Sequence, residues 1–121
     1  MMKKKLKELI KPIFYGFLRI SIDLAVRSQK LLELRKRLEA FVPDVTHQYT
    51  TNTIDSPYLQ TKVRSLHAFQ TYMASYAIDK SNQDSITVVD IGDSAGTHIQ
   101  YLNGIYPDLI NPYSVNLDPV A

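Results

Sequence analysis

The chain contains no cysteine, and this absence excludes disulfide bonds and thiolate metal sites. Its three histidines, His47, His67 and His98, are too widely spaced in the sequence to indicate a zinc site. The sequence also lacks the run of about 20 nearly uncharged apolar residues that a transmembrane helix requires. What remains is 121 residues with 45% hydrophobic content, which is enough for one ordinary domain with a modest core.

Negative charge is scarce in the first third of the chain. Residues 1–40 contain eleven Lys and Arg but four Asp and Glu, whereas residues 41–121 contain three and eight. A basic segment favours anionic partners, so we expect residues 1–42 either to contact an anionic membrane or to pack on the domain or a partner subunit. Nucleic acid is a further partner that this charge allows. Arg19 and Asp23 interrupt the early apolar run, which disfavours a secretion signal and predicts a cytoplasmic location, with a membrane-peripheral one as the alternative.

Apolar residues recur at helical spacing over residues 6–41, which predicts two helices or one kinked helix. Pro12 and Gly16 favour a break near the start, because proline removes a backbone donor and glycine weakens a helix interior. Pro43 is expected to end this part of the chain. We therefore interpret residues 1–43 as a basic amphipathic helical arm. On a membrane surface, its buried residues would be Ile10, Phe14, Phe17 and Leu18.

Residues 44–84 are predicted to form a loop and an accessory helix. The stretch 45–55 is polar and lacks helical periodicity, as is typical of a linker or loop. The helix then begins with Asp55 or Ser56 as its cap and Pro57 in its first turn. Its expected core-facing stripe consists of Leu59, Val63, Leu66, Phe69, Met73, Tyr76 and Ala77.

The hydrophobic period changes from helical to extended at residues 86–89, a β-branched run that is typical of a parallel strand covered on both faces. A helix is predicted over residues 97–106, and a second extended segment over residues 113–118. The expected fold class is α/β, in which N-terminal helices precede the first β-α-β unit of a doubly wound sheet within residues 85–121.

Two of the four glycines, Gly92 and Gly96, lie directly between the first predicted strand and the helix that follows it. Glycine at this position allows a sharp turn with positive φ and a close approach of a ligand to the backbone. The helix that begins near Gly96 would present free N–H groups and its positive dipole end to that ligand.

Residues 88–96, VVDIGDSAG, resemble the first motif of class I S-adenosylmethionine-dependent methyltransferases, an apolar strand that ends in Asp/Glu-x-Gly-x-Gly-x-Gly. Asp90, Gly92 and Gly96 match this motif, and Ser94 replaces its middle glycine. The resemblance implies a Rossmann-like fold and S-adenosyl-L-methionine as the cofactor.

Residues 115–118, VNLD, support the resemblance because they end in an acid, as the second motif of that family does. By this resemblance, Asp90 holds the cationic amino group of the methionine moiety, directly or through water, and Asp118 accepts hydrogen bonds from the ribose hydroxyls. His67, Tyr72 and Tyr76 are left outside the site, because aromatic residues at helical spacing are typical of cores and interfaces. The cofactor-binding residues implied are Asp90, Gly92, Ser94, Gly96 and Asp118.

Other functions compete for the same turn. Residues 92–96, GDSAG, also satisfy the nucleophile elbow of α/β-hydrolases, with Ser94 as the nucleophile. Against this hypothesis, no glycine-rich oxyanion loop precedes the turn and no histidine follows His98. A nicotinamide-binding turn would need glycine where Ser94 and Thr97 stand, and the ending of a phosphate-binding P-loop is missing. A noncatalytic helical adaptor remains a third hypothesis.

The resemblance covers residues 85–121, whereas a methyltransferase sheet usually has seven strands. We therefore expect the chain to be the N-terminal part of a longer enzyme, or its sheet to be completed by another chain through self-association. The expected reaction is methyl transfer to an O, N or C atom of an unidentified acceptor. The residues that activate the acceptor are expected beyond residue 121, so no catalytic residue is assigned.

Overall fold

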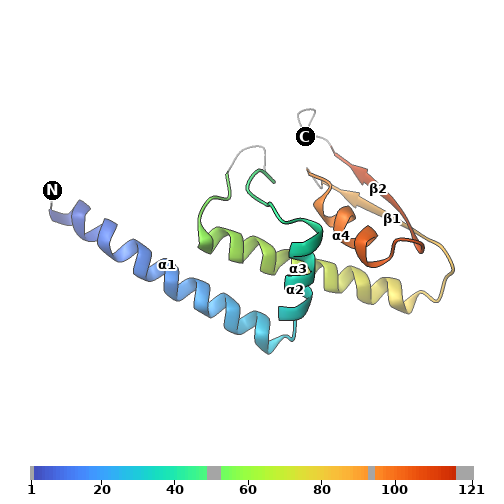
Figure 1. Cartoon of the computed structure of the whole chain (residues 1–121), viewed down its shortest axis with the longest axis horizontal. Helices are drawn as coiled ribbons and strands as arrows, with labels where there is room; N and C mark the ends of the chain where they lie inside the picture. The colour runs from blue at the N-terminus through green and yellow to red at the C-terminus, as the bar shows by residue number, and fades with distance from the viewer. Residues whose placement is uncertain (1, 49–52, 93–94, 117–121) are drawn as a thin grey trace.

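The computed structural model describes residues 2–48, 53–92 and 95–116. Four helices and two strands follow one another in these parts of the chain (Figure 1). They are α1 (Met2–Ser28), α2 (Leu32–Phe41), α3 (Pro57–Lys80), β1 (Ile86–Ile91), α4 (Thr97–Ile105) and β2 (Ile110–Val115). The α/β class is therefore confirmed, with the helices first and a parallel strand pair at the end. No helix in the described ranges is long and apolar enough to cross a membrane.

Residues 1–43 contain two helices, which is one of the two arrangements that the sequence predicts, but the break between the helices does not lie near Pro12. Pro12 lies inside α1 without interrupting it, so the expected break near Pro12 and Gly16 is wrong. The carbonyl that loses its donor there belongs to Glu8, and this stretch of α1 is exposed, so the loss costs less than it would in a buried helix. The chain turns at Lys30 instead, where φ is 59°, and α2 then packs on α3.

Helix α3 begins as the sequence predicts. The Ser56 hydroxyl accepts a hydrogen bond from the Leu59 backbone N–H at 3.2 Å, and Pro57 occupies the first helical position. The predicted core-facing stripe is wrong, however. Of its seven residues only Val63 is buried, and four are about half exposed: Leu66, Phe69, Met73 and Tyr76.

The buried face of α3 carries smaller and more polar side chains: Val63, His67, Ala68, Thr71 and Ile78. These side chains allow α2, α4 and the sheet to approach the helix closely, since a helix–helix distance depends on the side chains at the contact. One core cluster joins Leu38 of α2, Ala68 of α3 and Tyr101 of α4. A second joins Ile78 of α3, Leu102 of α4 and Ile110 of β2.

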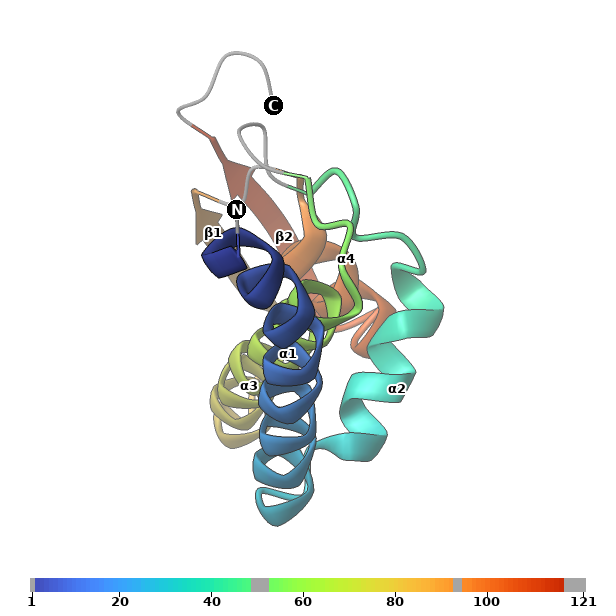
Figure 2. The same ribbon diagram turned by 90° about the vertical axis from the view of Figure 1, so that its left-hand side faces the viewer.

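Strands β1 and β2 are adjacent and parallel, and α4 connects them. Their register pairs Ile86 with Ile110 and Ile91 with Val115, so both strands reach the same edge. Figures 1 and 2 place the strand pair near the C-terminal half of α3, and α3 and α4 pack against the same face of the pair.

The expectation that β1 is covered on both faces is wrong within the described residues. Burial alternates along the strand, and Ile91 is 74% exposed on the uncovered face. The reason is that α3 and α4 both pack on the other face, where Ile86 and Val88 contact the second core cluster. The second extended segment lies earlier than predicted, over residues 110–115.

Candidate functional site

The turn after β1 has the backbone geometry that its glycines predict. Gly92 has φ of 89° and Gly96 has φ of 65°, both in the left-handed region where a side chain adds strain. The Gly92 N–H donates to the Val115 carbonyl at 2.8 Å, which holds the start of the turn against the end of β2. Helix α4 then begins at Thr97, directly after Gly96. The strand therefore ends, turns and enters a helix within a few residues, as cofactor-binding β-α units do.

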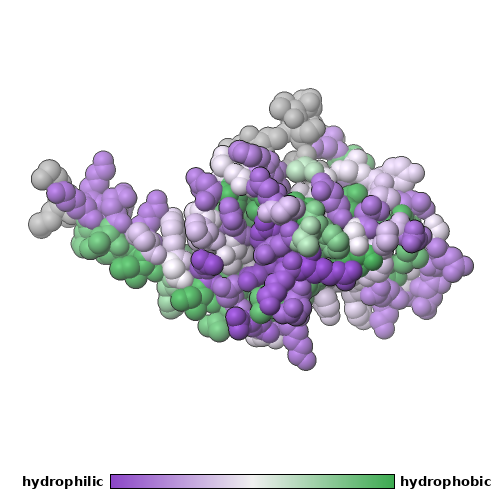
Figure 3. Space-filling model, viewed as in Figure 1, coloured by the Kyte–Doolittle hydropathy of each residue, from purple (hydrophilic) through white to green (hydrophobic). Residues whose placement is uncertain are grey.

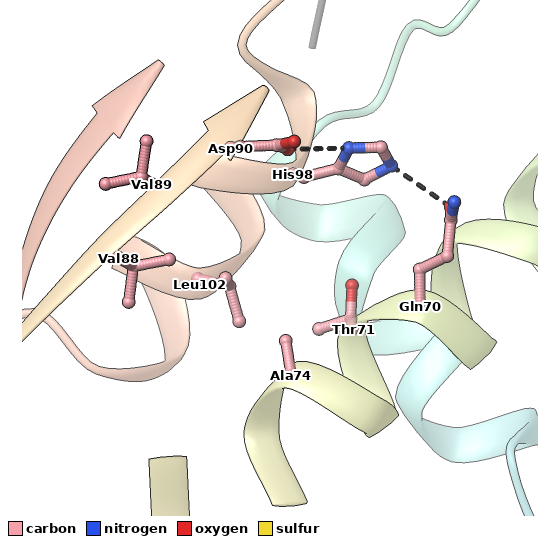
Figure 4. Close-up of a pocket in the computed structure, with 8 residues that line it drawn as sticks. All are labelled: Gln70, Thr71, Ala74, Val88, Val89, Asp90, His98 and Leu102. Carbon is pink, nitrogen blue, oxygen red and sulfur yellow. Dashed lines mark hydrogen bonds and ion pairs between the residues drawn. The ribbon is translucent and has the colours of Figure 1, made fainter. Parts of the chain in front are cut away.

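Asp90 lies one residue before the end of β1, paired in register with Ser114. Its side chain points toward the helical layer, and its Oδ2 lies 2.9 Å from Nδ1 of His98 in the first turn of α4 (Figure 4). The two side chains are 25% and 26% exposed. The pair thus connects the end of the strand to the beginning of the next helix, at the edge of solvent.

His98 also reaches the helical layer on its other side. Its Nε2 lies 3.1 Å from Oε1 of Gln70 on α3. Both ring nitrogens of His98 therefore face an oxygen atom of a neighbouring side chain. Asp90, His98 and Gln70 therefore form a polar chain that spans β1, α4 and α3 (Figure 4).

A cavity of about 260 Å³ lies beside this polar chain. Its walls come from α3, β1 and α4: Gln70, Thr71, Ala74, Val88, Val89, Asp90, His98 and Leu102. Thr71 is 2% exposed, and among the described residues its Oγ1 has no hydrogen-bond partner. A buried hydroxyl without a partner is unfavourable, so a ligand or water that bonds to Thr71 would be stabilised there. The site thus combines an apolar wall with polar groups on one side.

His98 packs against a buried polar cluster that consists of His67, Gln48 and Tyr101. The His67 ring meets the His98 ring edge to face, with 5.2 Å between centroids. His67 is 1% exposed and bonds Gln48 through Nε2 at 2.9 Å and the Tyr101 hydroxyl through Nδ1 at 3.1 Å. His67 therefore belongs to the core. Tyr72 and Tyr76, also excluded, are about half exposed on α3.

Three of the five predicted site residues lie in the described chain. Asp90, Gly92 and Gly96 come together at the carboxyl end of β1 and the start of α4. Ser94 and Asp118 lie outside the described residues. The register does bring the carboxyl end of β2 beside that of β1, since Ile91 pairs with Val115.

The sequence interpretation missed the contribution of three residues. The sequence interpretation gives His98 no role in the cofactor site, although its place in the first turn of the helix after the glycines points it back at the strand end. Gln70 and Thr71 gave no signal, because their contact with the turn depends on how α3 packs. In the described residues, no group of three or more His, Asp or Glu side chains is placed to bind a metal ion.

Comparisons of the chain with protein-family models, with curated proteins and with solved structures find no match. Any function must therefore be argued from the geometry of this site.

Proposed function

We propose that the chain contributes the cofactor-binding unit of an S-adenosylmethionine-dependent methyltransferase. One observation carries the proposal: a carboxylate at the end of a parallel strand precedes a turn with two left-handed glycines, and a helix leads from it to the adjacent parallel strand. This arrangement has the acid and the close-approach glycines that a nucleotide-type cofactor requires. The chemical class follows from Asp90, because a carboxylate at that position suits a ligand with a positive charge.

The described residues fit the methionine moiety of this cofactor. Chain neighbours apart, a Cβ added at Gly92 would meet no atom of the described residues within 4 Å, which leaves room for a ligand beside the turn. Asp90 offers its carboxylate to an ammonium group, and Thr71 supplies the unpaired hydroxyl in the same cavity. The cavity of about 260 Å³ is smaller than the roughly 300–1,000 Å³ of sites that hold a whole ligand. We therefore assign it the methionine end, with the adenosine over the glycine turn.

His98 already occupies one oxygen of the Asp90 carboxylate. The ammonium group of a ligand would replace that contact or use the other carboxylate oxygen. Methyl transfer itself moves the methyl group from the sulfonium of the cofactor to a nucleophilic O, N or C atom of the acceptor. The residues of this chain would bind and orient the cofactor in that reaction.

The Asp90–His98 pair also favours a second candidate, an α/β-hydrolase. A carboxylate bonded to Nδ1 of a histidine is two thirds of a Ser-His-Asp triad, and Ser94 lies between them in sequence. In a triad, however, Nε2 of the histidine faces the serine, whereas Nε2 of His98 faces Gln70. We therefore rank the hydrolase second to the methyltransferase.

The proposal is tested by calorimetric titration of the chain with S-adenosylmethionine, up to about 1 mM, the upper end of ordinary KM values. Asp90→Asn removes the carboxylate charge and is expected to weaken binding about 10- to 100-fold, the equivalent of one charged hydrogen bond. Asp108→Asn is the matched control, since it removes the same charge from an exposed turn at the opposite end of the strands and is expected to leave affinity unchanged.

Two results would contradict the proposal. If the chain fails to bind the cofactor, or if Asp90→Asn and Asp108→Asn bind equally well, then the glycine turn is only a tight connection, as in the adaptor hypothesis. Labelling of Ser94 by an active-site serine probe, lost in His98→Ala, would establish the hydrolase instead.

A further inference from the structure

Helix α1 exposes a continuous apolar stripe. Six large apolar side chains, each 56–71% exposed, recur along it: Leu6, Leu9, Ile13, Phe17, Ile20 and Leu24. At about 100° per residue, these six fall within an arc of roughly 80°, and they extend over about 27 Å of helix. An apolar surface of this length and alignment indicates a binding surface rather than scattered exposed side chains.

The stripe faces away from the rest of the protein. The opposite side of α1 packs on α3 through Tyr15, which stacks on Tyr58 with ring centroids 5.2 Å apart, and through the buried Val26. In Figure 1 the N-terminal part of α1 projects beyond the other helices. Figure 3 shows hydrophobic atoms along one side of this projection and hydrophilic atoms along the other. Leu18, which the sequence interpretation placed on the lipid side, is partly buried instead.

The charge on α1 identifies the surface that would cover the stripe. The segment Met2–Ser28 contains seven Lys and Arg but two Asp and Glu. Arg27 lies at one margin of the stripe, and Lys5 lies about 40° from that margin around the helix axis. At such positions, long basic side chains reach lipid headgroups while apolar side chains lie deeper. A second copy of the chain would oppose this helix with an equally basic one, and a nucleic acid would leave the apolar stripe uncovered.

We propose that α1 binds in the plane of an anionic phospholipid surface. Its apolar stripe lies at the boundary of headgroups and acyl chains, and the basic side chains at the margin of the stripe, Lys5 and Arg27, attract the anionic lipids. The globular part is then held on the aqueous side, because α3 packs on the opposite face of α1. This inference does not depend on the cofactor, and its test does not involve S-adenosylmethionine.

The test is cosedimentation of the full chain with vesicles of phosphatidylcholine, with and without phosphatidylserine. We expect binding to the anionic vesicles that weakens as salt is added, because the attraction between the basic side chains of α1 and the anionic headgroups is screened. The triple variant Leu9→Ser, Ile13→Ser, Phe17→Ser should reduce that binding at least 10-fold, because it removes three large apolar side chains from the stripe. The matched control is Leu66→Ser, Phe69→Ser, Met73→Ser on α3, whose side chains are also about half exposed or more, and it should bind as the wild type does.

Each other outcome overturns the proposal. No binding at low salt, or equal binding to neutral and anionic vesicles, would exclude a charged lipid surface as the partner. Equal binding by the two triple variants would exclude the stripe. Concentration-dependent dimers in light scattering without lipid, abolished only by the α1 variant, would assign the stripe to a second copy of the chain. Circular dichroism of both variants verifies that their helices remain intact.

Discussion

Two helical glycines, Gly16 and Gly104, should respond in opposite ways to replacement by alanine: the first substitution should raise the stability of the protein and the second should lower it. Gly16 lies in the middle of α1, and an added Cβ there meets no atom within 4 Å. Gly104 lies near the end of α4, and an added Cβ there would be 2.9 Å from Cδ1 and Cε1 of Phe41 and 3.0 Å from its Cγ. The same substitution is therefore free of contacts in one helix and obstructed by an aromatic ring in the other.

The magnitudes follow from two effects. Alanine stabilises an exposed helix interior by about 0.5–1 kcal/mol relative to glycine, so Gly16→Ala should raise the free energy of unfolding by that amount. At Gly104 the ring must move by several tenths of an ångström, although it packs against the cluster of Leu38, Ala68 and Tyr101. Overpacking of this kind costs about 1–3 kcal/mol and exceeds the gain in propensity. We expect Gly104→Ala to be less stable than the wild type by about 1–2 kcal/mol.

Urea unfolding followed by circular dichroism measures both changes, read as shifts of the midpoint at an unchanged slope. A double variant, Gly104→Ala with Phe41→Leu, should show a smaller cost for the glycine substitution than the wild-type background does, because the ring that obstructs the Cβ is gone. If Gly104→Ala proves as stable as Gly16→Ala, the close packing of α2 against α4 is refuted.

Two further predictions concern the core and the pH range. Leu38→Ala should lower the free energy of unfolding by about 2–5 kcal/mol, because Leu38 is 2% exposed. Leu24→Ala, at a 62% exposed position, should change it by about 0.5 kcal/mol or less. Equal effects of the two variants in urea unfolding would contradict the assignment of Leu38 to the core. Burial, and then the hydrogen bond that its hydroxyl donates to Asp79 Oδ1 at 2.8 Å, raise the pKa of Tyr106 above its ordinary value of 10.0. The folded state then holds the Tyr106 proton more tightly than the unfolded state does. The stability gained in this way is complete below about pH 10 and is lost as pH rises through the folded pKa. The urea midpoint should therefore fall more steeply with pH in the wild type than in Tyr106→Phe, and parallel curves would contradict this prediction.

Local chemistry made several features of this chain predictable. Ser56 and Pro57 fix the beginning of α3, because a cap and a fixed φ act within one turn. Gly92 and Gly96 indicate a left-handed turn between a strand and a helix, and both have positive φ in the structure. The resemblance to the methyltransferase motif placed Asp90 at the end of a strand, and Asp90 does lie near the end of β1. These predictions succeeded because each depends on a few neighbouring residues.

The apolar stripes show where local pattern was insufficient. The helical period of α3 correctly predicted a helix, but the face with the larger apolar residues is exposed, and Ala68 and Thr71 lie on the buried face instead. Periodicity indicates which residues share a helix face. Which face is buried depends on how closely the neighbouring helices can approach it. Pro12 does not break α1, and the local pattern could not show that the carbonyl without a donor would lie on an exposed helix.

The sequence by itself determined the order of the elements, the glycine turn and the acid that precedes it. Only the tertiary structure decided that this acid meets His98, that His98 meets Gln70 of α3, and that Thr71 borders the same cavity. Gln70 and His98 are 28 positions apart. Their contact arises because α3 packs on the face of β1 that carries Asp90, and that packing is set by the summed fit of many side chains rather than by any local motif.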